Sequence, residues 1–258
     1  MTENMKIQIL DVETCEKCVS RNCSFLNVAK VCTGFNNMKS ETTVCPTLAI
    51  GDRGPVGLVG SDGYISAEEC VSCGLCVVYC NKANLICADH DSDTSEFGEL
   101  TELQLKAVVS QYLMCLFEFA ANTNRNRAML FDGYMTDRFG EQAFVEIDYN
   151  NDSLKCTRRL LGDIMMFSGS RNIRNGLLVL SELPSAGNRD VYALIEKMRA
   201  FPTTSHINVF MTTLSHLREM ALFLTPGEYG MNDLFYDCTS ESVEEYKSRI
   251  AVLTSTRT

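Results

Sequence analysis

Residues 70–80 read Cys70-Val71-Ser72-Cys73-Gly74-Leu75-Cys76-Val77-Val78-Tyr79-Cys80, which places four cysteines at the spacing C-x2-C-x2-C-x3-C. Three thiolates separated by two residues each can wrap a loop around one face of an iron–sulfur cube. A disulfide has no use for cysteines this crowded. The stretch therefore predicts a loop that holds a metal cluster, and it contains four of the 13 cysteines of the chain.

A second group of cysteines lies upstream. Cys15, Cys18 and Cys23 form C-x2-C-x4-C, and Cys45 is followed directly by Pro46. Together the two groups resemble the paired motifs of the bacterial two-cluster ferredoxins, in which the fourth cysteine of a motif ligates the other cluster. The resemblance implies a ferredoxin-like iron–sulfur domain over residues 1–90. It also implies two 4Fe–4S clusters that serve electron transfer or redox sensing.

The same resemblance implies which cysteines are the metal ligands of each cluster. The first cluster takes Cys15, Cys18, Cys23 and the remote Cys80, and the second takes Cys70, Cys73, Cys76 and the remote Cys45. The crossing of ligands between the two motifs comes from the family and not from the spacing.

Two features depart from the family pattern. Cys23 and Cys45 are separated by 21 residues where the family has a short spacing, and Asn81 follows Cys80 where the family usually has proline. Cys32 lies inside this insertion and can replace Cys23 as a ligand. A single cluster held by the second motif is one alternative, and two zinc sites of four cysteines each are another. Zinc fits less well, because zinc knuckles use two separated C-x2-C pairs.

The whole chain, at 258 residues, has room for one large or two modest domains. Its start, Met1-Thr2-Glu3-Asn4, lacks the basic segment and apolar run of a secretory signal. The most apolar stretch, Tyr112 to Ala121, is too short to span a bilayer. A chain with many cysteines and no export signal is expected in a reducing compartment. We therefore expect a cytoplasmic protein without membrane contact.

The net charge of −10 is concentrated in the N-terminal part of the chain. Residues 1–99 hold 7 Lys/Arg against 14 Asp/Glu, and residues 100–258 hold 16 against 19. An acidic cluster domain suits docking to a basic redox partner protein or a larger complex. Positive charge is needed near phosphates, so this part is a poor match for nucleic acid. The alternative is that the acidity only keeps the protein soluble.

The acidic, polar residues 91–99 are expected to link the first domain to a second one over residues 100–258. The second domain is predicted to alternate helices and strands, starting from a helix capped by Thr101 and including an antiparallel hairpin. Its expected elements are a helix to Leu116, strands in 128–135 and 143–149, a helix over 154–167, a strand over 176–181, a helix to 200, a strand over 206–212 and helices over 214–224 and 241–253. This order predicts a mixed α/β sheet flanked by helices, following the α+β iron–sulfur domain.

Acidic residues lie on both strands of the predicted hairpin, as Asp132 and as Glu146-Ile147-Asp148. With the order of elements, they resemble the restriction-endonuclease-like fold of metal-dependent nucleases over residues 100–215. That resemblance implies Asp132, Glu146 and Asp148 as catalytic residues, with Mg²⁺ or Mn²⁺ as a cofactor. Asp148 stands where the family has lysine, and Lys155 is a candidate substitute.

For several other side chains of the second domain, the sequence allows more than one role. Asp132-Gly133 can simply make a turn. Six arginines can contact phosphates around a metal site, which would make nucleic acid a partner, or can form a solvated face that pairs with acids. These are Arg125, Arg127, Arg158, Arg159, Arg171 and Arg174.

Four isolated cysteines are expected to be small, buried side chains of the core. They are Cys87, Cys115, Cys156 and Cys238. The alternative to a redox protein is therefore a nuclease, or a nuclease-derived protein, with structural clusters.

Overall fold

The chain folds as two compact units. The computed structural model describes residues 7–9, 30–35, 38–43, 45–46, 70–80, 85–87, 100–122, 131–149, 152–171, 173–184 and 189–255. The first unit comprises Met1–Thr33 with Ser40–Tyr112, and the second comprises Gly34–Lys39 with Leu113–Thr258. The expected linker at 91–99 lies outside the described residues. The domain limits of 1–90 and 100–258 stay predictions.

The N-terminal half contains short elements. They are β1 (Ile7–Ile9), β2 (Lys30–Phe35), β3 (Met38–Thr43), α2 (Leu75–Tyr79), β4 (Leu85–Cys87) and α3 (Glu102–Leu116). β1 pairs antiparallel with β4, with Ile7 opposite Cys87, and β2 pairs with β3. α3 begins after Thr101, as predicted, and its residues up to Tyr112 belong to the first unit.

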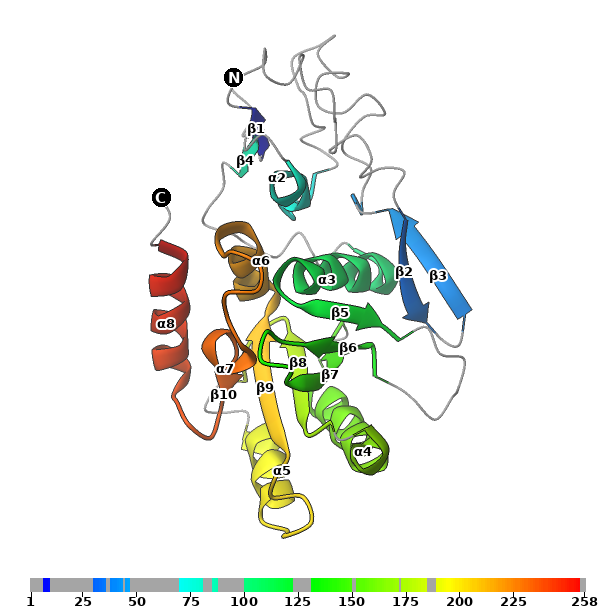
Figure 1. The fold of residues 1–258 in the computed structure, drawn as a ribbon, viewed down its shortest axis with the longest axis vertical. Helices are drawn as coiled ribbons and strands as arrows, with labels where there is room; N and C mark the ends of the chain where they lie inside the picture. The colour runs from blue at the N-terminus through cyan, green and yellow to red at the C-terminus, as the bar shows by residue number, and fades with distance from the viewer. Residues whose placement is uncertain are drawn as a thin grey trace. The chain divides into compact units, whose positions relative to one another are not determined.

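The second unit is built on a six-stranded mixed sheet in the order β10-β9-β8-β7-β6-β5 (Figure 1). Its elements are β5 (Glu118–Ala121), β6 (Gly133–Thr136), β7 (Gln142–Ile147), α4 (Ser153–Arg171), β8 (Asn175–Leu180), α5 (Arg189–Arg199), β9 (Asn208–Thr213), α6 (Leu214–Phe223), α7 (Met231–Leu234), β10 (Tyr236–Asp237) and α8 (Val243–Ser255). β7, β8 and β9 are parallel, and the remaining pairs are antiparallel. The predicted mixed sheet flanked by helices is confirmed for this unit.

Most predicted elements of this unit are confirmed, including the hairpin, which is β6 paired with β7. Three elements were not predicted: β5, α7 and β10. They contain only four, four and two residues. α7 spans a single helical turn and β10 two residues, so neither shows a repeating pattern in the sequence, and β5 follows α3 without glycine or proline between them.

The two faces of the sheet are covered by different helices. Gly176 of β8 faces Leu160 and Ile164 of α4, and α5 packs beside α4. On the opposite face, the hydroxyl groups of Thr212 in β9 and Tyr246 in α8 lie 3.0 Å apart. α4 and α5 share a face because both connect parallel strands through crossovers of the same hand (Figure 1).

Gly176 allows α4 to lie unusually close to the sheet. A Cβ atom at this position would lie 2.7 Å from Cδ2 of Leu160 and 2.8 Å from Cδ1 of Ile164. Both leucine and isoleucine side chains are fully buried, so they have little room to move away. The glycine therefore sets the distance between α4 and β8.

We expect Gly176→Ala to lower the free energy of unfolding by about 1–3 kcal/mol, because the added methyl group overpacks this contact. Gly162 of α4 is the matched control, since a Cβ there would meet nothing within 4 Å. Gly162→Ala should raise stability by about 0.5–1 kcal/mol through helix propensity. Urea unfolding followed by circular dichroism measures both changes. Equal effects of the two substitutions would contradict the close contact.

Candidate functional site

The predicted cluster loop curls around Cys73. Ser72 has a φ of 53° and Gly74 a φ of 71°, so left-handed residues flank this cysteine on both sides. Such a conformation is unfavourable for serine by about 1 kcal/mol or more. Turns of this kind direct successive backbone N–H groups into a concavity, as occurs at many iron–sulfur sites. Left-handed residues at 72 and 74 thus bend the backbone on both sides of Cys73.

The described cysteines of the two motifs are free thiols, and most are buried. Cys45, Cys70, Cys73 and Cys76 are buried, and Cys80 is half-buried. The remaining predicted ligands, Cys15, Cys18 and Cys23, lie outside the described residues, and the alternative ligand Cys32 lies in β2. The second predicted ligand set is therefore described in full, and the first only through Cys80.

Helix α3 contacts the segment that carries Cys45. Its first turn has a capping box, in which Thr101 N donates to Oε1 of Gln104 at 2.9 Å and Gln104 N donates back to Oγ1 of Thr101 at 3.3 Å. The amide nitrogen Nε2 of the same Gln104 donates to the carbonyl oxygen of Pro46 at 2.7 Å. One side chain thus caps the helix and binds the residue after Cys45.

Two further bonds join α3 to the 70–80 loop. The hydroxyl of Tyr112, a fully buried side chain, donates to the carbonyl oxygen of Cys73 at 2.6 Å. The hydroxyl of Tyr79, which precedes Cys80, donates to Oε1 of Gln111. Residues 101–112 therefore contact the chain next to Cys45, at Cys73 and next to Cys80.

The donor set fits an iron–sulfur cluster in its chemistry. Four thiols are buried, form no disulfide and lie on two segments that α3 contacts. Thiolates are the ligands that iron–sulfur clusters use, and backbone N–H groups and burial adjust their potentials. In the described part of the chain, no three His, Cys, Asp or Glu side chains are grouped as ligands of a single metal ion.

The three predicted acids of the second unit lie close together. Asp132 directly precedes β6, Glu146 lies in β7, and Asp148 follows the last residue of β7. Oδ2 of Asp132 accepts a hydrogen bond from Ile147 N at 2.8 Å, so this carboxylate reaches across to the neighbouring strand. Oδ1 of Asp148 accepts from Asp152 N at 3.0 Å, at the start of α4.

Glu146 forms an ion pair with Arg159 of α4. The Nη2 and Oε1 atoms lie 2.7 Å apart, and the Glu146 side chain has no exposure while that of Arg159 is 26% exposed. Burial lowers the pKa of Arg159, but the carboxylates of Glu146 and Asp132 raise it by more. The arginine therefore stays charged and compensates the buried carboxylate.

Cys156 of α4 lies at the centre of the acidic group, which we define as Asp132, Glu146 and Asp148. Burial and then Asp148, Glu146 and Asp132 raise the pKa of its thiol, against a smaller opposing effect of Arg159. The thiol is thus protonated at neutral pH and is no nucleophile. Cys156 is buried, as expected, but its acidic surroundings were not predicted.

The remaining candidate residues of this region lie apart from the acidic group. Lys155, the proposed substitute for the lysine of the nuclease family, is exposed, and so are Arg158 and Arg174. Arg125 and Arg127 lie outside the described residues. Of the described arginines in the predicted cluster, Arg159 is the one for which an ion pair with an acid is seen.

These two sites stand without support from known proteins. No family model, curated protein or solved structure matches this chain. In the described part of the chain, no helix is long and apolar enough to cross a membrane.

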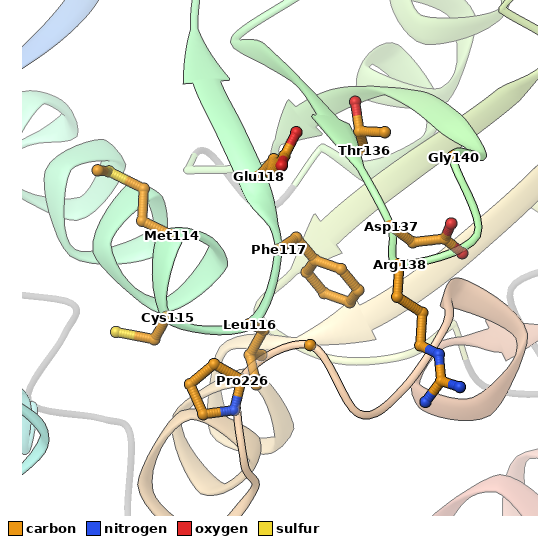
Figure 2. A pocket seen from close by; sticks show the side chains of 11 residues that line it. Met114, Cys115, Leu116, Phe117, Glu118, Thr136, Asp137, Arg138, Gly140 and Pro226 are labelled. Carbon is orange, nitrogen blue, oxygen red and sulfur yellow. The ribbon is translucent and has the colours of Figure 1, made fainter.

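A pocket of about 510 Å³ lies in the second unit, between the end of α3, β5, the β6–β7 turn and the loop after α6 (Figure 2). Two of its charged side chains already have partners. Asp137 accepts bonds from Phe139 N, Glu141 N and Met231 N, and Arg138 donates to the carbonyl of Glu228. Burial raises the pKa of the nearby Cys115 thiol to about 11. At neutral pH the Cys115 thiol of this pocket is therefore protonated.

We expect Arg159→Met to lower the free energy of unfolding by about 3 kcal/mol, because it leaves the buried Glu146 carboxylate without its counter-charge. Arg158→Met, the adjacent and exposed residue of the same helix, is the control and should change stability by less than about 0.5 kcal/mol. Adding Glu146→Gln to Arg159→Met should recover part of the loss, since the uncompensated charge is removed. Urea unfolding measures all three. Equal stability of the two arginine variants would show that the ion pair contributes nothing.

Proposed function

We propose that this protein is an iron–sulfur protein whose first unit carries two 4Fe–4S clusters of the ferredoxin type. The observation that carries the proposal is the curled loop at Cys73, in which Cys70, Cys73 and Cys76 are each buried, as is Cys45 on a second segment. Bound clusters supply one-electron chemistry, for electron transfer or for redox sensing. The second set of ligands would be Cys45, Cys70, Cys73 and Cys76.

The first set would join Cys80 with Cys15, Cys18 and Cys23, or with Cys32 in place of Cys23. Cys80 is half-buried and directly follows α2, as its C-cap residue. The crossed assignment of Cys80 to the first cluster comes from the ferredoxin resemblance. The half-burial of Cys80 also suits a cluster near the protein surface, where a partner can receive electrons.

The partner in this proposal is a basic redox protein or a larger complex in the cytoplasm. Residues 1–99 have a net charge of −7, which favours association with a positively charged surface through long-range attraction. The mixed α/β unit would then dock the carrier or receive its signal.

We expect anaerobically prepared protein to contain about eight irons and eight sulfides per chain, the content of two cubane clusters. Reduction with dithionite should produce the electron-spin resonance of reduced cubanes. About four irons would support the single-cluster alternative, and zinc in place of iron would support the four-cysteine zinc sites. Protein that takes up neither iron nor sulfide during anaerobic reconstitution would overturn the proposal.

Replacing a ligand should remove one cluster and keep the other. We expect Cys76→Ala to lower the iron content to about half, because one of four thiolates of the second cluster is lost. Cys238→Ala, a cysteine of the second unit, is the control and should keep the full content. An unchanged iron content in Cys76→Ala would exclude this cysteine as a ligand.

The acidic group supports a second candidate function. We propose, as the alternative, a metal-dependent nuclease or a nuclease-derived protein that processes nucleic acid, with a restriction-endonuclease-like second unit and structural clusters. The observation in its favour is that Oδ2 of Asp132 accepts a hydrogen bond from Ile147 N, between Glu146 and Asp148 in sequence, and that all three acids raise the pKa of the Cys156 thiol. Mg²⁺ or Mn²⁺ would be held by their oxygen atoms. Such an ion would compete with Arg159 for Glu146.

A cleavage assay separates the two functions. If the nuclease proposal holds, the protein cuts DNA or RNA in the presence of Mn²⁺ or Mg²⁺, and Asp132→Asn lowers the rate at least about 100-fold because a charged ligand is lost. Asp152→Asn, at an exposed acid nearby, is the control and should leave the rate unchanged. Intact substrates after incubation with the unsubstituted, folded protein would exclude catalysis by the acidic group.

A further inference from the structure

Helix α3 contacts both segments that carry the proposed ligands of the second cluster. Gln104, in its first turn, binds the carbonyl of Pro46, and Tyr112, two turns later, binds the carbonyl of Cys73. The ligand Cys45 is the neighbour of Pro46 in sequence. We propose that Gln104 and Tyr112 are positioning residues, which hold the Cys45 segment and the 70–76 loop in the arrangement that the second cluster requires. This inference rests on the proposed iron–sulfur function.

Gln104 is suited to this role because its side chain is fixed at both ends. Its Oε1 atom accepts bonds from the backbone N–H and the hydroxyl of Thr101, at 2.9 and 2.8 Å, while Nε2 donates to Pro46. A side chain held in this way has little conformational freedom left to lose, so its bond to Pro46 restrains that segment effectively. The carbonyl of Pro46 is thereby tied to the start of a regular helix.

Tyr112 restrains the loop at the residue where its backbone is least regular. The Cys73 peptide lies between two left-handed residues, and α2 starts only at Leu75, where Val77 N and Val78 N bond to the carbonyl of Gly74. The carbonyl of Cys73 is instead bonded by Tyr112, whose side chain has no exposure. A buried hydroxyl bonded to a buried carbonyl is costly to separate, because both groups would need other partners.

The hydroxyl of Tyr112 also has an electrostatic effect at this position. Its proton opposes the negative end of the Cys73 carbonyl dipole, next to the thiolate that would ligate the cluster. Without the hydroxyl, the partial negative charge of the Cys73 carbonyl oxygen has no proton facing it. That charge then makes the addition of an electron to the cluster less favourable. Hydrogen bonds around the ligands are one of the means by which proteins set cluster potentials.

The matched variants are Tyr112→Phe and Tyr246→Phe, studied in the full-length, cluster-loaded protein. Tyr246, in the second unit, is also fully buried, and its hydroxyl lies 3.0 Å from that of Thr212. Both substitutions therefore delete one buried, hydrogen-bonded hydroxyl, but only the first deletes one that contacts a ligand segment. Gln104→Glu is the second test variant: glutamate preserves the capping box and removes the donor to Pro46.

We expect Tyr112→Phe to lower the reduction potential of one cluster. In the titration, dithionite donates one electron to the cluster, and no bond of the side chain is made or broken. The equilibrium constant for reduction should fall about three- to tenfold, where tenfold corresponds to about 59 mV. Gln104→Glu should release iron to a chelator about three- to tenfold faster, since the Cys45 segment loses a hydrogen bond. Tyr246→Phe should change neither quantity.

The outcomes distinguish this inference from the proposed function. If the unsubstituted protein binds no cluster, the proposed function itself fails. If clusters are present in every variant with the original potential and rate of iron release, the inference alone is overturned. It is also overturned if Tyr246→Phe shifts the potential as much as Tyr112→Phe, because the effect would then reflect general destabilisation. Should Tyr112→Phe fail to fold, the rate of iron release from Gln104→Glu decides.

Discussion

A carboxylate without any exposure to solvent, that of Glu146, lies in the central part of the sheet of the second unit. A buried charge is strongly unfavourable unless another charge compensates it. This requirement fixes the position of Arg159, and hence the rotation of α4 above β7 and β8. α4 also lies close to the sheet at Gly176, where a Cβ atom would meet the side chains of Leu160 and Ile164. The ion pair and this close contact both join α4 to the strands beneath it, and Cys156 of the same helix is buried.

In the first unit, polar side chains of α3 bind the backbone of both segments that carry the proposed ligands of the second cluster. α2 has only five residues, and two left-handed residues precede it in the 70–76 loop. Hydrogen bonds from a longer helix therefore add order where the local helix is short. The first three turns of α3 supply these bonds through Gln104, Gln111 and Tyr112. A metal cluster would add to the same order, because ligand binding and folding are coupled in small metal-binding domains.

The sequence predicts much of the fold, but less of the site. The helix cap at Thr101, the β6–β7 hairpin and the mixed sheet follow from local patterns and from the order of elements, and each is found in the structure. β5 was missed because it starts two residues after α3 and has neither glycine nor proline before it to mark the change. The two hairpin strands were enough to predict that Asp132 and Glu146 lie near each other, since paired strands bring their residues together.

Which helix residues bind the acidic side chains depends on how each helix packs against the sheet. The local sequence does not determine this packing. Arg159 was one of six clustered arginines, and only the rotation of α4 selects it as the partner of Glu146. The hydrogen-bond partner of Tyr112 could not be predicted from the sequence either. Apolar residues at helical spacing around it indicate only that it is a core residue. It is a core residue, but its hydroxyl binds Cys73 across 39 positions of sequence. Contacts of this range follow from tertiary packing rather than from any periodic pattern.

The position of Arg159 bears on how the acidic group can work. Asp148 stands where the nuclease resemblance would require lysine, and the cation that pairs with Glu146 is Arg159 on α4. A guanidinium does not lose its proton at neutral pH and binds carboxylates with fixed geometry. A lysine at that place can take up or release a proton, and Arg159 cannot. The arrangement therefore favours a charge balance that stabilises the sheet, and any metal chemistry would first require Arg159 to leave Glu146.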